Sequence, residues 1–215
     1  MSWIEDLRSA NWNLAGSLCL FSYALGCFTG GYYLVRLLAN VDIREIGSGS
    51  VGARNVGRVL GKRGFFLTMF FDFGKGALAV WVARLFTGDD RLIALSMLAV
   101  VAGHIWPGQL RFHGGKGMAT SLGALLVYDP QLAATFAILS LCLSVGMRRL
   151  VLPSLLALAC LPLASLLLSH THTKIVLVSV LAGLVVIAHR KNLAEEFLQL
   201  ASRRHLEPKT DRPPL

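Results

Sequence analysis

Residues 64–86 read GFFLTMFFDFGKGALAVWVARLF, an apolar run that contains only three charged side chains. A helix needs about 20 predominantly apolar residues to cross the hydrocarbon core of a bilayer, and this run is long enough. The whole chain has a similar character, with 54% hydrophobic and 15% charged residues and a mean hydropathy of +0.60. Because a soluble domain of this composition could not cover its own surface, the sequence predicts a polytopic membrane protein.

The hydropathy of the chain gives candidate spans at 14–38, 64–86, 92–107, 118–128, 130–147, 150–168 and 174–188. The expected fold is therefore all-α, a bundle of about seven transmembrane helices with Gly-rich loops on the cytoplasmic side. We expect residues 1–200 to form a single domain and residues 201–215 to form a polar cytoplasmic tail. Several spans are shorter than about 20 residues. Such helices are tolerated around a wet cavity, so they indicate a site within the membrane.

The basic residues of the connections lie mainly on one side of the predicted bundle. With seven crossings, that side holds Arg44, Arg54, Arg58, Lys62, Arg63, Arg111, Lys116, Arg148, Arg149, Arg190, Lys191, Arg203, Arg204, Lys209 and Arg212. The opposite side has only Arg8, Arg91 and Lys174. The positive-inside rule places the basic side in the cytoplasm. The net charge of +9 therefore follows membrane topology and does not indicate nucleic acid.

The first glycine-rich segment is GSGSVGARNVGRVLGKRG, which begins at Gly47. It satisfies G-x-G-x-x-G, but the strand and the βαβ unit that dinucleotide binding requires are missing. Glycine lets backbone N–H groups approach a ligand closely, and Ser48, Ser50 and Arg58 lie nearby. Such a nest beside a guanidinium suits a phosphate. Taken alone, the segment fits equally well a flexible loop whose basic residues face anionic lipid headgroups.

The second segment, GHIWPGQLRFHGGKGMATS, places Lys116 among Gly114, Gly115 and Gly117 where a helix begins. A helix N-terminus with bare amides and an ammonium group also favours a phosphate. Gly117 stands where a Walker A motif needs Ser or Thr, so ATP hydrolysis is unsupported.

The third segment, AHRKNLAEEF, carries His189 and Asn192 at the end of the last span. His189 is a candidate general base, a candidate donor to phosphate, or an interfacial residue hydrogen-bonded to a carbonyl, and the last is commonest for a lone His at a helix end. Three such segments on one face of the membrane indicate a common site.

Two ionisable residues, Asp72 and Lys75, lie three residues apart inside the second span. Each would cost about 2.5–3.5 kcal/mol at a helix centre, so we expect them to pair or to contact a polar cavity. A mutual salt bridge that braces the bundle is at least as good an interpretation as substrate contact. No metal site is predicted, because the His residues lack carboxylate or Cys partners at ligand spacing.

The motifs GSGSVGARNVGRVLG, DFGKG, GHIWPGQLRFHGGKGMAT, HRKN and EPK follow one another over roughly residues 44–209. In this order they resemble the bacterial acyl-phosphate:glycerol-3-phosphate acyltransferases, an integral membrane family. The resemblance implies transfer of a fatty acyl group from acyl phosphate to the 1-hydroxyl of glycerol 3-phosphate, giving lysophosphatidic acid and phosphate. It also implies a seven-helix fold in the bacterial inner membrane, a site facing the cytoplasm, and no cofactor or metal. We expect a monomer.

The resemblance also implies roles for single residues. The implied catalytic residues are Lys116, His189, Asn192, Arg58 and Ser154. The implied substrate-binding residues are Ser48, Gly49, Ser50, Gly52, Asn55, Gly114 and Gly115. Arg148 and Ser154 match a fifth-loop segment of the family less closely than the other residues match their motifs.

Three positions depart from the usual pattern of the family. Ser50 stands where Asn is usual, Arg54 where Thr is usual, and Val151 where a Ser is usual. Arg54 adds charge and bulk to the first segment, which either tightens anion binding or obstructs it. The alternative function is a membrane carrier or a non-catalytic binder of phosphorylated solutes. A carrier is favoured by ionisable groups in both halves of a bundle and by inverted repeats, and the sequence shows neither.

Overall fold

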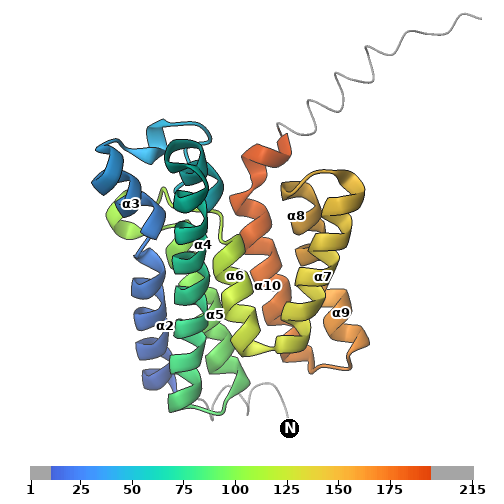
Figure 1. Cartoon of the computed structure of the whole chain (residues 1–215). Coiled ribbons are helices and arrows are strands. Elements are labelled where there is room, and N and C mark those ends of the chain that lie inside the picture. Colours follow the sequence, from blue (N-terminus) through green and yellow to red (C-terminus); the bar gives the residue numbers. More distant parts are fainter. Residues whose placement is uncertain (1–10, 195–215) are drawn as a thin grey trace, which may run out of the picture.

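The computed structural model describes residues 11–194, so the tail predicted at 201–215 lies outside the described residues. Within the described range the chain forms helices and no strand (Figure 1). The α-helices are α2 (Trp12–Cys27), α3 (Gly30–Ala39), α4 (Ala53–Phe86), α5 (Asp90–Ile105), α6 (Met118–Tyr128), α7 (Pro130–Met147), α8 (Val151–Ala159), α9 (Leu161–Leu167) and α10 (His172–Ala188). Two short 3-10 helices are η1 (Ile43–Glu45) and η2 (Gly108–Leu110).

Most of the bundle consists of apolar helical segments of the kind found in membranes. Four helical segments are long and apolar enough to cross a membrane: Trp12–Ala39, Ala53–Phe86, Asp90–Leu110 and Pro130–Met147. Three shorter apolar segments accompany them: Met118–Tyr128, Val151–Leu167 and His172–Ala188. The prediction of an all-α, multi-pass membrane bundle of about seven spans is therefore confirmed.

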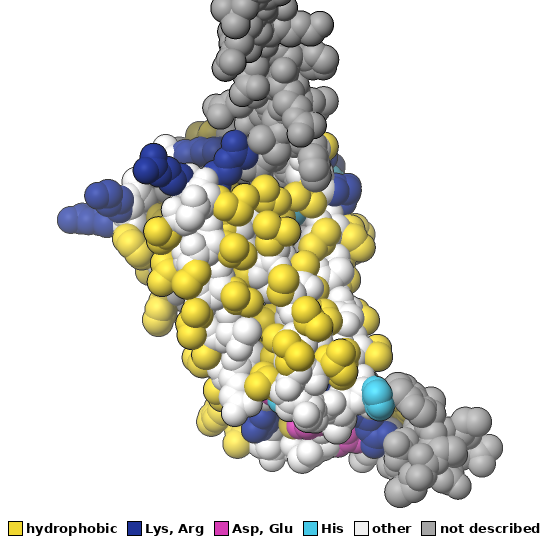
Figure 2. All heavy atoms as spheres, turned by 90° about the vertical axis from the view of Figure 1, so that its right-hand side faces the viewer, with side chains coloured by type: hydrophobic (Ala, Val, Ile, Leu, Met, Phe, Trp, Pro, Cys, Tyr) yellow, Lys and Arg dark blue, Asp and Glu magenta, His cyan; other side chains and the backbone are white. Residues whose placement is uncertain are grey.

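The outer surface is divided along the bundle into an apolar band and two polar ends (Figure 2). Leu141, Val145 and Leu167 are among the large apolar side chains that lie more than half exposed. Such exposure is expected where lipid rather than water surrounds the helices. We call the end of the bundle that carries Arg54, Lys62 and the other basic residues of the loops the basic end.

The first predicted span, 14–38, is not one helix, because the helical structure is interrupted between α2 and α3. A break inside a membrane frees backbone carbonyls that lipid cannot satisfy. Here Lys75 Nζ donates to the carbonyls of Gly26 and Phe28 at 3.1 and 2.9 Å, and Gln109 Nε2 donates to the carbonyl between them. Side chains far away in the sequence therefore make the interruption possible.

Helix α4 begins at Ala53, eleven residues before the predicted span at Gly64. The segment expected as a loop is therefore partly helical, and Arg54 and Arg58 lie on the first two turns of α4. The helix bends at Gly61, where φ is 66° and ψ is −164°. This backbone conformation is essentially restricted to glycine. The bend lets the first turns of α4 lean away from the axis of its membrane-spanning part.

The predicted span 150–168 is divided into α8 and α9. Pro162 lies in the first turn of α9, where its missing N–H costs least. Hydropathy alone gave one continuous span because the residues on both sides of the break are apolar.

Helices α4 and α6 approach each other closely. A Cβ on Gly76 would fall on the carbonyl oxygen of Thr120, and a Cβ on Gly123 would fall on that of Phe73. Small residues at such contacts let two membrane helices pack backbone against backbone. This contact fixes the first turns of α6, which follow Lys116 directly in the sequence, against the middle of α4.

Candidate active site

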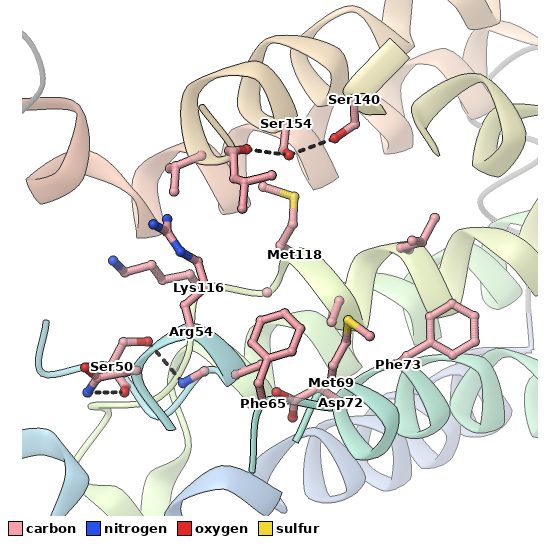
Figure 3. A pocket seen from close by; sticks show the side chains of 18 of the residues that line it. Ser50, Arg54, Phe65, Met69, Asp72, Phe73, Lys116, Met118, Ser140 and Ser154 are labelled. Carbon is pink, nitrogen blue, oxygen red and sulfur yellow. Dashed lines mark hydrogen bonds between the residues drawn. The ribbon is translucent and has the colours of Figure 1, made fainter. Parts of the chain in front are cut away.

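A cavity of about 960 Å³ lies between α4 and α6 on one side and α7 and α8 on the other (Figure 3). Its volume falls within the range of pockets that bind small molecules. Its mouth, at the basic end, is polar, and its interior is apolar. The interior is lined by side chains of four helices, including Phe65, Phe66, Met69, Phe70, Phe73, Met118, Leu122, Phe136 and Leu141.

The mouth brings together residues of all three segments that the sequence singled out. It is lined by Ser48, Ser50, Gly52, Arg54, Asn55, Arg58, Lys116, His189 and Asn192. Lys116 Nζ donates a hydrogen bond to Asn192 Oδ1, which joins the second segment to the third. Ser154 lines the interior, whereas Gly49, Gly114, Gly115 and Arg148 do not line the cavity. Residues of the three segments therefore meet around one cavity at the basic end of the bundle.

Asn55 organises the first segment. Its side chain is buried, with 1% exposed. Its Nδ2 lies within hydrogen-bonding distance of three loop carbonyls, those of Ile43, Ile46 and Ser50, at 3.1, 2.8 and 3.0 Å. Its Oδ1 accepts from the backbone N–H of Ser48 at 3.1 Å and from Arg58 Nη1 at 3.4 Å. Because its polar atoms are hydrogen-bonded within the loop, Asn55 maintains the conformation of the first segment, the candidate phosphate-binding loop.

The two glycines before Lys116 are also engaged within the chain. The N–H of Gly114 donates to the carbonyl of Ile105 at 3.1 Å, and that of Gly115 donates to the carbonyl of His104 at 2.9 Å. A Cβ on Gly115 would overlap the imidazole of His104. Gly114 and Gly115 therefore pack the segment against the end of α5 and present Lys116 to the cavity.

The first and second segments contact each other directly. Arg44 Nη1 donates to the carbonyl of Leu110 at 3.0 Å, and the N–H of Val51 reaches the carbonyl of Gly114 at 3.5 Å. A salt bridge of 2.6 Å to Asp42 holds the Arg44 guanidinium in place. The pKa of the Asp42 carboxyl is lowered, and the hydrogen bond from Arg44 is the largest cause of this shift. These contacts join the segments into one polar layer at the basic end.

His189 follows the last residue of α10 and is buried, with 4% exposed. Its Nδ1 lies 2.8 Å from the carbonyl of Val185. A carbonyl only accepts, so Nδ1 carries the proton and Nε2 is left as an acceptor in the neutral ring. Burial lowers the pKa of His189 to about 4; the bond to Val185 opposes this shift, and the charges of Lys116 and Arg54 add to it. His189 is thus a neutral acceptor at pH 7, and its bond to a carbonyl agrees with one of the three interpretations given from the sequence.

Ser154 on α8 is bonded to a residue that the sequence did not single out. Ser154 Oγ donates to the carbonyl of Leu150 at 2.7 Å, so the hydrogen of its 2.7 Å contact with Ser140 Oγ comes from Ser140. Both serines line the cavity, and Figure 3 shows this pair across from Met118. The available signal was the i, i+4 spacing of Ser140 and Ser144 within an apolar span, which places both hydroxyls on one face of α7.

A buried charged cluster lies at the floor of the cavity. Lys75 Nζ is 3.1 Å from Asp72 Oδ1 and 2.8 Å from His104 Nδ1. Asp72 and His104 line the cavity, each with 3% exposed. The predicted salt bridge between Asp72 and Lys75 is confirmed, and His104 is a member that the sequence did not reveal. Across residues 11–194, no three His, Cys, Asp or Glu side chains form a group that could hold a metal ion.

The arrangement suits an amphiphilic ligand with an anionic head. Arg54, Arg58 and Lys116 supply positive charge at the mouth, while Asp72, the only carboxylate of the lining among residues 11–194, is paired at the floor. Figure 3 shows Arg54 and Lys116 reaching toward the same part of the cavity. Charge-assisted hydrogen bonds from such cations are strongest with phosphate or carboxylate. The aromatic and apolar interior would hold a hydrocarbon chain.

Comparison with known proteins places the chain in a membrane enzyme family. The sequence profile of the family described as glycerol-3-phosphate acyltransferase matches residues 17–198. The chain is 42% identical over 194 residues to glycerol-3-phosphate acyltransferase 1 of Desulfitobacterium hafniense, covering 88% of this chain and 96% of that protein. It is 36% identical over 194 residues to glycerol-3-phosphate acyltransferase of Gloeobacter violaceus, covering 88% and 94%.

Two crystal structures share the fold. One is the glycerol 3-phosphate form of PlsY (YgiH), an integral membrane glycerol 3-phosphate acyltransferase, with a TM-score of 0.81 and 33% identity. The other is the lysophosphatidic acid form of the same enzyme, with a TM-score of 0.78 and 31% identity. Each comparison covers 86% of this chain and 92% of the other chain.

Proposed function

The chain belongs to the glycerol-3-phosphate acyltransferase family, and from this premise we propose that it transfers a fatty acyl group from acyl phosphate to the 1-hydroxyl of glycerol 3-phosphate. The hydroxyl oxygen forms a bond to the acyl carbonyl carbon, and the bond from that carbon to the phosphate oxygen breaks. The products are lysophosphatidic acid and inorganic phosphate. This reaction is the first acylation of phospholipid synthesis.

One observation carries the proposal: a single cavity combines a cationic mouth with a deep apolar interior. Both proposed substrates carry a phosphate, and one of them also carries a hydrocarbon chain. Two phosphates repel each other, so the mouth must hold both anions against that repulsion. We assign this task to Arg58 and Lys116, with Asn192 fixing the Lys116 side chain.

Neutral His189 supports a role as an acceptor. Its Nε2 is available to accept a hydrogen bond from a glycerol hydroxyl and to orient that oxygen toward the acyl carbonyl. Phosphate is a good leaving group, and one of its oxygens can take the hydroxyl proton, so no protein nucleophile is required. Proximity and orientation alone can remove about 7–11 kcal/mol of a barrier. Catalysis in this scheme rests on positioning and on charge stabilisation.

The same reasoning extends to the setting of the enzyme. We infer that it lies in the bacterial inner membrane with its basic end in the cytoplasm, since basic residues favour the cytoplasmic side. We retain the proposal that residues 1–200 form one transmembrane domain followed by a polar tail.

The decisive experiment is acyl transfer by the purified protein in a lipidic medium. Palmitoyl phosphate and glycerol 3-phosphate are supplied, and phosphate release is followed together with lysophosphatidic acid, while palmitoyl-CoA replaces the donor in a parallel reaction. We expect product from acyl phosphate only. Lys116→Ala should lower kcat/KM by about 10²–10³, the usual cost of removing one donor that stabilises developing charge.

Lys62→Ala serves as the matched control, because Lys62 is an exposed lysine of the basic end outside the cavity lining. It should keep normal turnover. Near-normal turnover by Lys116→Ala would contradict the mechanism. No product from either donor, in protein shown to be folded, would favour a binder or carrier of phosphorylated solutes.

A further inference from the structure

The buried cluster of Asp72, Lys75 and His104 has no part in the proposed chemistry, yet two of its members line the cavity and His104 also contacts the segment that carries Lys116. Lys75 is 5% exposed, and Asp72 and His104 are 3% exposed. Charged groups at this depth are costly unless each one is paired. Such a cluster therefore calls for a reason beyond packing.

Lys75 Nζ has close polar contacts with four groups. Its Nζ lies 3.1 Å from Asp72 Oδ1, 2.8 Å from His104 Nδ1, and 3.1 and 2.9 Å from the carbonyls of Gly26 and Phe28. The carbonyls belong to the break between α2 and α3, so the ammonium is fixed by α4, by α5 and by the end of α2. These contacts leave few alternative positions for the ammonium group of Lys75.

The same cluster holds the imidazole of His104 in place. His104 Nδ1 lies 2.8 Å from Lys75 Nζ and 3.3 Å from Asp72 Oδ1, so both members of the salt bridge contact the same edge of the imidazole. Nε2 is the imidazole atom nearest to the position that a Cβ of Gly115 would occupy. Lys75 thus orients the ring whose far edge faces Gly115.

His104 contacts Gly115 in two ways. Its carbonyl accepts from the N–H of Gly115 at 2.9 Å, and its imidazole edge fills the space beside the Gly115 Cα. Lys116 is the next residue, and its Nζ donates to Asn192 Oδ1 at the mouth of the cavity. The position of Lys116 therefore depends on the imidazole below the preceding residue.

We propose that the cluster of Asp72, Lys75 and His104 is a positioning unit that fixes the position of the Gly115–Lys116 segment relative to the cavity. The consequence for catalysis rests on the proposed function, in which Lys116 holds a substrate phosphate. The positioning itself is independent of the reaction. Because displacement of a catalytic group by about 1 Å can cost about 10²-fold in rate, a shift of this segment should be measurable.

The test exchanges volume between the two contacting residues. Gly115→Ala adds a methyl group where the imidazole edge lies. His104→Asn retains a side-chain acceptor near Lys75 and removes that edge. Each single variant should lower kcat/KM by about ten- to a hundredfold, and the double variant should be at least about tenfold more active than Gly115→Ala alone, since contacting sites couple.

Gly114→Ala is the matched control. A Cβ at Gly114 would fall on the carbonyl oxygen of His104, which the change to Asn does not remove. No recovery is therefore expected when Gly114→Ala is combined with His104→Asn. The proposal is overturned if the effects of Gly115→Ala and His104→Asn simply multiply, or if the folded single variants keep normal kcat/KM.

Two further measurements separate the possible causes. Unfolding temperatures show whether a variant is merely destabilised, since a purely structural role lowers them while the folded protein keeps its kcat/KM. Calorimetric titration with glycerol 3-phosphate tests positioning without turnover, because recovery of affinity in the double variant supports the proposal. If the wild type bound glycerol 3-phosphate but made no product, the proposed function would fail while the pattern of affinities still tested the positioning unit.

Discussion

Arg54 is one of the three positions at which this chain departs from the usual family pattern, and it lies at the mouth of the cavity. Its side chain is exposed and lines the cavity, and no ion pair links it to a carboxylate within the described part of the chain. Its charge is close enough to His189 to lower the pKa of that ring. These observations favour the interpretation that Arg54 tightens anion binding over the interpretation that it obstructs the site.

Arg54→Thr should therefore raise KM for glycerol 3-phosphate or for acyl phosphate by about threefold, because an exposed charge contributes about 0.2–1 kcal/mol. The difference from the wild type should shrink as salt is added, since salt screens exposed charges. Initial rates at several ionic strengths measure both effects. Arg63→Thr, an exposed arginine outside the cavity lining, should leave KM unchanged. A lower KM in Arg54→Thr would show that the arginine obstructs the site.

His189 gives the fold a specific dependence on pH. Its pKa is lowered from 6.5 to about 4 in the folded protein, so the fold favours the neutral ring. The corresponding stability is fully present above about pH 6.5 and is lost progressively as the pH falls through about 4. The unfolding temperature should thus fall on acidification from pH 7 to pH 4.5, and His189→Gln should reduce the slope. His113→Gln, at an exposed loop position, should follow the wild type; equal slopes for all three proteins would contradict this explanation.

The residues that could be predicted were those that belong to short local motifs with recognisable chemistry. Lys116, His189 and Asn192 stand in short polar segments, and topology alone was enough to bring those segments to one face. The cluster around His104 and the hydroxyl of Ser140 could not be predicted, because their partners come from other helices. Local motifs also do not distinguish a residue that touches a ligand from one, such as Asn55, that shapes the loop around it.

At the scale of elements, the bend in α4 connects the membrane-spanning helix with the mouth of the cavity. Gly61→Ala should destabilise the protein by about 1–3 kcal/mol, because alanine is strained at a φ of 66° and a ψ of −164°. A Cβ there would meet nothing within 4 Å, so collision is not the cause. Straightening the helix would also displace Arg58 and raise KM. Unfolding temperature and steady-state kinetics measure the two effects.

Gly74→Ala is the control within the same helix. Its Cβ would also meet nothing within 4 Å, and no positive φ is found there. Alanine has the higher helix propensity, so this variant should be as stable as the wild type or slightly more stable. If Gly61→Ala behaved in the same way, the bend would not depend on the conformation of glycine.

Helix breaks were the least predictable part of the fold. Hydropathy averages over an interruption when both flanks are apolar, as in the predicted spans 14–38 and 150–168. The first break persists because Lys75 and Gln109 donate to its carbonyls, and neither residue is close to it in the sequence. Its existence is therefore a tertiary property, whereas the presence and the order of the apolar helices followed from composition and length.

At the scale of the whole molecule, the proposed orientation can be tested by labelling. Lys62 and His172 are exposed, and they lie at the basic end and at the opposite end of the bundle. In a background lacking the four native cysteines, Lys62→Cys should react with a membrane-impermeant thiol reagent only after the inner membrane is opened. His172→Cys should react from the periplasmic side in intact spheroplasts. The reverse pattern would place the cavity mouth outside the cytoplasm.

The apolar interior of the cavity has a kinetic consequence for an enzyme embedded in lipid. A donor and a product that carry long hydrocarbon chains partition into the bilayer, so the enzyme meets them by diffusion in two dimensions. For the proposed reaction, the relevant concentration of acyl phosphate is its mole fraction among the lipids. Adding inert lipid at constant total donor should therefore slow the reaction by surface dilution, whereas diluting the aqueous phase should affect only the water-soluble glycerol 3-phosphate.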